Sequence, residues 1–63
     1  MKYAIYFSDS GQPHNHNTRA VFAQTEYGAI AAFDALCKWY LHVTVFEALN
    51  NGDVKIIRNY KNI

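Results

Sequence analysis

The chain has 63 residues, which is near the lower size at which one hydrophobic core is stable without disulfides, metal or self-association. Hydrophobic residues make up 51% of it and charged residues only 17%, so the composition excludes a disordered protein. The formal net charge of +1 excludes a global field that would recruit nucleic acid or an anionic membrane. We therefore expect residues 1–63 to form a single compact domain.

The cysteine content and the apolar runs indicate the compartment. Cys37 is the only cysteine, so no internal disulfide can form and nothing indicates an oxidising environment. No stretch approaches the roughly 18 apolar residues of a membrane span, and the apolar run at the start is too short for a secretory signal. We expect a cytoplasmic protein.

The first third of the chain predicts two strands joined by a long loop. Residues 2–8 alternate, and the residues on one side of this strand form a predicted core set: Tyr3, Ile5 and Phe7. Residues 8–18 contain Gly11 and Pro13 and are longer than a tight hairpin needs. Residues 19–24 read as a second strand with apolar side chains on both faces, so its register cannot be assigned.

Residues 25–40 carry the one long helical period. Thr25 is a good N-cap, and Glu26 is favourable in the first turn. Trp39 lies beside the apolar stripe and is expected to be partly exposed. The apolar face comprises Ala29, Ile30, Phe33, Leu36, Cys37 and Tyr40.

The last third of the chain predicts a hairpin. Residues 41–49 form a strand, and Asn51-Gly52 predicts a type I′ turn that places Asn50 opposite Asp53 and Phe46 opposite Ile57. The core face would then hold Val43, Val45, Leu49, Val54, Ile56 and Tyr60, with Glu47 and Arg58 neutralising each other diagonally. The opposite face would hold His42, Thr44, Ala48, Lys55, Asn59 and Lys61, with Phe46 and Ile57 as an apolar pair.

These elements predict an α+β fold: a single ββαββ module with a four-stranded, mainly antiparallel sheet and one helix packed on one face. The order of elements resembles that of the small β-grasp immunoglobulin-binding domains. That resemblance implies a parallel pair of first and last strands at the centre of the sheet. A different strand order is equally compatible with the sequence.

One helix covers only one face of a sheet, so the other face is the predicted binding surface. Its protein-binding candidates are Tyr6, Phe46, Ile57 and His42, with Trp39 on a second surface, and the partner is another protein or a second copy in a homodimer. In the alternative, the partner is single-stranded nucleic acid. Its bases would stack on the ring of Tyr6, and its phosphates would contact Lys2, Lys55 and Lys61. The near-neutral charge and the lack of an RNP-like motif favour a protein.

Metal binding is a weaker hypothesis. His14 and His16, with Asp9 or His42, could supply ligands for zinc or a similar metal, although a solvated polar loop is the favoured interpretation. The adjacent letters HNH do not reproduce the spacing of the nuclease motif of that name.

The sequence contains no motif that is typical of an enzyme. There is no Gly-x-Ser-x-Gly elbow and no phosphate-cradling loop, and the five acidic residues are scattered. We expect a non-enzymatic module without a cofactor. Its size is typical of phage or mobile-element accessory proteins that bind and inhibit a host macromolecule.

Overall fold

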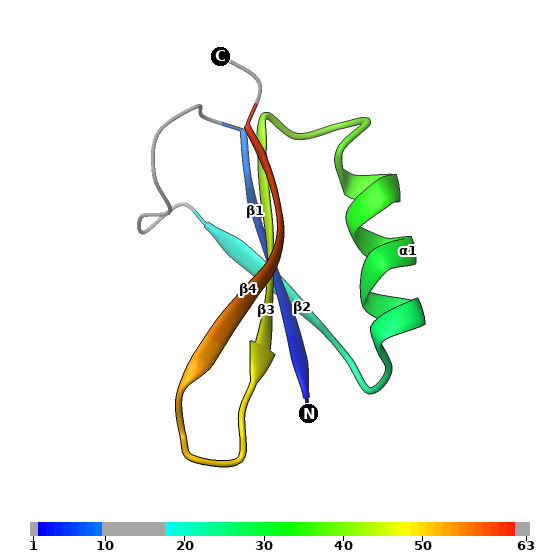
Figure 1. The fold of residues 1–63 in the computed structure, drawn as a ribbon. Helices are drawn as coiled ribbons and strands as arrows, with labels where there is room; N and C mark the ends of the chain where they lie inside the picture. Colours follow the sequence, from blue (N-terminus) through cyan, green and yellow to red (C-terminus); the bar gives the residue numbers. More distant parts are fainter. Residues whose placement is uncertain (1, 10–17, 62–63) are drawn as a thin grey trace.

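The structure, a computed structural model, describes residues 2–9 and 18–61 and consists of one four-stranded sheet with one helix on one side (Figure 1). The elements in chain order are β1 (Tyr3–Ser8), β2 (Arg19–Ala23), α1 (Glu26–Leu36), β3 (His42–Ala48) and β4 (Val54–Lys61). The predicted ββαββ α+β module is confirmed.

The strands lie in the order β2-β1-β3-β4, and each neighbouring pair is antiparallel. The first and last strands do not pair, so the arrangement implied by the β-grasp resemblance is wrong. The hairpin places β4 beside β3, at one edge of the sheet. β2 and β3 lie on opposite sides of β1, so the connection through α1 crosses over β1. The helix consequently packs on β1, β3 and β2.

The helix begins where the sequence predicts and ends earlier. The Thr25 Oγ1 accepts a hydrogen bond from the backbone N–H of Gly28 at 3.1 Å, which caps the first turn. At the other end the N–H of Trp39 donates to the carbonyl of Leu36, an i→i+3 bond that tightens the chain into a turn. The helix therefore stops at Leu36 rather than continuing to Tyr40.

The core lies between α1 and the two central strands. Its buried members share the helix-facing side of β1 and β3: Tyr3, Ile5, Phe7, Val43 and Val45, together with Ala29 of the helix. The predicted core positions of β1 are confirmed. The helix and its end add partly buried side chains around them: Ala32, Phe33, Leu36 and Cys37. Tyr40, after the helix, packs against Phe7 with tilted rings whose centroids are 4.7 Å apart.

The turn between β3 and β4 is not the predicted type I′ turn. The N–H of Gly52 donates to the Leu49 carbonyl at 3.1 Å, and the N–H of Leu49 donates to the Asp53 carbonyl at 2.8 Å. Gly52, with φ of 89°, is the one described residue with positive φ, whereas a type I′ turn needs two. The loop thus has three residues, and Asn51 closes it by accepting from the Asp53 N–H at 3.0 Å.

The longer turn shifts the register of the hairpin by one residue near the turn. Phe46 lies opposite Ile56, whereas Val45 lies opposite Arg58, so Ile57 is the extra residue of a β-bulge. The predicted pairs from Val43 to Val45 are confirmed, and those from Phe46 to Leu49 are wrong.

The bulge changes which side chains of β4 face the helix. Ile57 packs against the core, contrary to its predicted place on the open face. Val54 and Ile56 were predicted as core, and they are 64% and 58% exposed. Leu49 is also exposed.

The bulge predicts that two adjacent isoleucines contribute very differently to the free energy of unfolding. Ile57→Ala removes contacts with the core and should lower the free energy of unfolding by about 1–2 kcal/mol, whereas Ile56→Ala at an exposed site should change it by less than about 0.5 kcal/mol. Urea unfolding of dilute protein measures both. The reverse order would contradict the observed register.

The turn predicts strain at Gly52. A Cβ there meets no atom within 4 Å, so Gly52→Ala suffers only the backbone cost of positive φ and should lose about 1–2 kcal/mol of stability. Gly52→Asn is the matched control, because asparagine tolerates this conformation, and it should lose under about 1 kcal/mol. Equal losses for the two variants in thermal unfolding would argue against a conformational cause.

Candidate protein-binding face

The face of the sheet away from α1 is organised in rows of side chains that cross all four strands. One row runs Phe22, Ala4, Phe46 and Ile56, because Ala4 pairs with both Phe22 and Phe46, and Phe46 pairs with Ile56. The next row toward the β3–β4 turn contains the pair Ala48 and Val54. The next row away from that turn contains the pair Ala20 and Tyr6. We call these eight uncharged residues the apolar patch: Ala4, Tyr6, Ala20, Phe22, Phe46, Ala48, Val54 and Ile56.

The apolar patch contains a shallow hollow. It has a volume of about 180 Å³ and is lined by Ala4, Tyr6, Phe46 and Val54. The rings of Tyr6 and Phe46 meet edge to face with centroids 5.3 Å apart, which fixes one wall. The small side chain of Ala4 leaves the space between larger neighbours open. Phe22 of β2 lies opposite Ala4 of β1 and is 57% exposed.

The other end of the same face is polar and closed. The Thr44 Oγ1 donates a hydrogen bond to the Asn59 Oδ1 at 2.7 Å, and the His42 Nε2 makes a hydrogen bond with the same oxygen at 3.2 Å. His42, Thr44 and Ser8 are buried. In the described residues no buried side-chain nitrogen or oxygen lacks a hydrogen-bond partner. This network is therefore a satisfied structural cluster, and the predicted contact residue His42 is not accessible.

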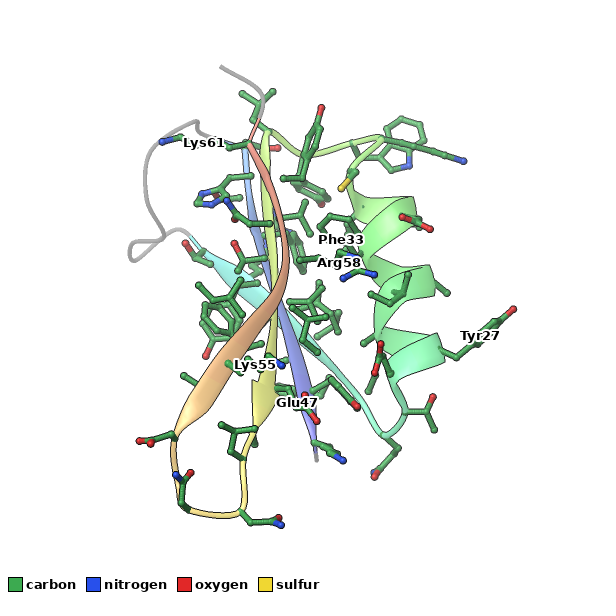
Figure 2. The ribbon with its side chains drawn as sticks, viewed as in Figure 1. Tyr27, Phe33, Glu47, Lys55, Arg58 and Lys61 are labelled. Atoms are coloured by element: carbon green, nitrogen blue, oxygen red, sulfur yellow. The ribbon has the colours of Figure 1, made fainter. Side chains whose placement is uncertain are left out.

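Two of the three predicted phosphate-binding lysines lie beside Glu47. The Lys2 Nζ is 3.5 Å from the Glu47 Oε2 and 5.9 Å from the ring centroid of Tyr3, a core residue on the helix side. Lys55 lies directly opposite Glu47 and so shares its face (Figure 2). Lys61 lies opposite His42, at the polar end of the open face.

Two ionisable groups near the core have perturbed pKa values. Burial, followed by the nearby Glu47 carboxylate, raises the pKa of the Tyr3 hydroxyl above its ordinary value of 10.0. Burial and the neighbouring Asp34 raise the pKa of the Cys37 thiol. Cys37 is thus held in the neutral form, which is a weak nucleophile.

The outer surface of the helix carries isolated aromatic residues. Trp39 is 79% exposed and Tyr27 is 86% exposed, and Tyr27 points away from the sheet (Figure 2). They lie at opposite ends of the helical segment, with Ala31, Asp34 and Ala35 between them. They therefore form no continuous apolar surface, and the predicted second surface at Trp39 is separate from the apolar patch.

Metal ligands do not gather in the described part of the chain. Within residues 2–9 and 18–61, no three side chains of His, Cys, Asp or Glu lie close enough together to hold a metal ion. The predicted candidates His14 and His16 lie outside these residues. No helix among the described residues is long and apolar enough to cross a membrane.

Comparison with known proteins adds no relative. The chain matches no protein-family model, and no curated protein or solved structure is significantly similar to it.

The structure brings together only part of the predicted binding set. The rings of Tyr6 and Phe46 lie side by side, whereas Ile57 packs against the core, His42 is buried and Trp39 lies after the helix. The sequence did not identify Ala4, Phe22, Val54 and Ile56. Phe22 carried a signal, since a strand with apolar residues on both faces must expose one set wherever only one face is covered.

The raised pKa of Tyr3 predicts a loss of stability at alkaline pH. Because the folded protein favours the neutral phenol, the contribution of Tyr3 is complete below the unfolded pKa of 10.0 and is lost as pH rises through the higher folded value. Tyr3→Phe should flatten the fall in unfolding free energy above about pH 10 relative to the wild type. An unchanged fall in Tyr3→Phe would contradict this cause.

Proposed function

We propose that this protein is a small, non-enzymatic protein-interaction module that binds its partner through the apolar patch. The observation that carries the proposal is an uncharged surface with a preformed hollow on the uncovered face of the sheet. Exposing such a surface to water costs free energy, and covering it with another apolar surface is favourable. A module that binds without chemistry acts by occluding or adapting its partner, which is compatible with an inhibitor.

The placement of charge favours a protein over a nucleic acid as the partner. Stacking of bases on Tyr6 and Phe46 would need cations around those rings to contact phosphates. The Lys2 Nζ is paired with Glu47, Lys55 lies on the helix side opposite Glu47, and the apolar patch itself has no charged member. Aromatic and aliphatic side chains that exclude charge are typical of the centre of a protein interface.

The edges of the sheet are less suitable for binding. β4 carries the bulge at Ile57 and three exposed cations, Lys55, Arg58 and Lys61, and such features prevent an edge from pairing with another strand. β2 has only five residues and begins with Arg19. The open face is therefore the better surface for a partner.

Site-specific photo-crosslinking in the native host tests the proposal. With p-benzoylphenylalanine in place of Val54, crosslinks to protein should form, and mass spectrometry should identify the species. The same group in place of Tyr27 is the control, and it should give few crosslinks because it lies on the helix side.

Two outcomes would contradict the proposal. Crosslinks from the Tyr27 position alone would move binding to the helix. Salt-sensitive binding of a short single-stranded oligonucleotide, weakened by Lys55→Glu, would favour the nucleic-acid alternative.

A further inference from the structure

The apolar patch carries both a projecting ring and a hollow able to receive one. The hollow of about 180 Å³ is comparable with the roughly 150 Å³ of an engineered protein cavity that binds benzene. Phe22 lies beside Ala4, a lining residue of the hollow, and exposes more than half of its side chain. One face thus presents a phenyl ring and a space of phenyl size next to each other.

A surface with these two features is complementary to itself. In a two-fold symmetric interface each copy uses the same patch, so a residue on one copy meets a different residue on the other, and the reverse contact forms automatically. Resting on the proposed function, we propose that the partner of the apolar patch is a second copy of this chain. In this dimer the two sheets pack face to face, and Phe22 of each copy occupies the hollow of the other.

The charge distribution permits this association. The eight residues of the apolar patch are uncharged, and the whole chain has a formal net charge of only +1. Two copies therefore approach without strong mutual repulsion and without burying an unpaired charge. The Lys2 Nζ is paired with the Glu47 carboxylate, so it does not enter the interface as an unpaired charge.

The size of the face sets the expected strength. The molecule measures 33 × 21 × 15 Å, and four strands about 4.8 Å apart account for the smallest dimension, so the open face covers at most about 500 Å², against roughly 800 Å² per partner in a standard interface. Contact over the apolar half alone buries less than this, which corresponds to a weak association. We expect a dissociation constant in the micromolar range, with monomers at high dilution.

The dimer also supplies the core that one copy lacks. Among the described residues, the buried apolar side chains are only six, and all lie on the helix side of the sheet. Packing the two open faces adds a second core and produces four layers, helix, sheet, sheet and helix. The second core adds buried surface that a single chain of 63 residues is too small to provide.

Sedimentation equilibrium from about 10 µM to about 1 mM tests the dimer. The wild type should change from monomer to dimer over this range. Phe22→Asp should weaken dimerisation at least tenfold, because it removes the ring and adds a charge to the interface. Tyr27→Asp is the matched control, an exposed aromatic residue on the helix side, and it should dimerise as the wild type does. Circular dichroism checks that each variant is folded.

Ala4→Leu separates a specific fit from general adhesion. Leucine fills the hollow and makes the face more apolar, so adhesion alone would strengthen association, whereas the proposed fit predicts at least tenfold weakening. Stronger association of Ala4→Leu would overturn the seating of Phe22.

The crosslinking experiment distinguishes failure of the dimer from failure of the proposed function. A wild type that stays monomeric at 1 mM, or a Phe22→Asp variant that dimerises normally, would overturn the dimer. If the Val54 position then crosslinks to a different protein, the interaction function stands and its partner is not a second copy. If it crosslinks to no protein, both proposals fail.

Discussion

One helix can cover only one side of a four-stranded sheet, and the rest of this structure follows from that limit. α1 spans the side over β1, β3 and β2, and among the described residues five buried apolar side chains of β1 and β3 lie beneath it, with Ala29 contributed by the helix itself. The opposite side must be tolerated in water or covered from outside. The chain uses both solutions on one face, with a satisfied polar cluster around His42 and Thr44 at one end and an apolar patch at the other.

The β-bulge at Ile57 determines which side chains populate these two surfaces. On the far side of the bulge from the turn, Tyr60 and Arg58 face the helix side, and on the near side Ile56 and Val54 face away from it. Without the extra residue, the same sequence would direct Ile56 into the core and Ile57 outward. The bulge also places Lys55 opposite Glu47, which keeps this charge off the apolar patch.

The separation of charge from the apolar patch links the fold to the proposed function. The Lys2 Nζ, Glu47 and Lys55 form a charged group beside Tyr3, whose hydroxyl has a raised pKa. The apolar patch is left with aromatic and aliphatic groups around a hollow. Such a surface suits a protein partner, and because it contains both a ring and a space for one, it also suits a second copy.

The sequence by itself determined the element order, the helix N-cap at Thr25, the core positions of β1 and the place of Tyr6 and Phe46 on the uncovered face. These depend on local periodicity and capping, which are encoded within a few residues. Only the tertiary structure decided the strand order, the turn type and the bulge. A three-residue loop and a two-residue type I′ turn both use Asn-Gly, and they differ by one residue in register. That one residue exchanges Ile56 and Ile57, because successive side chains of a strand point to opposite faces.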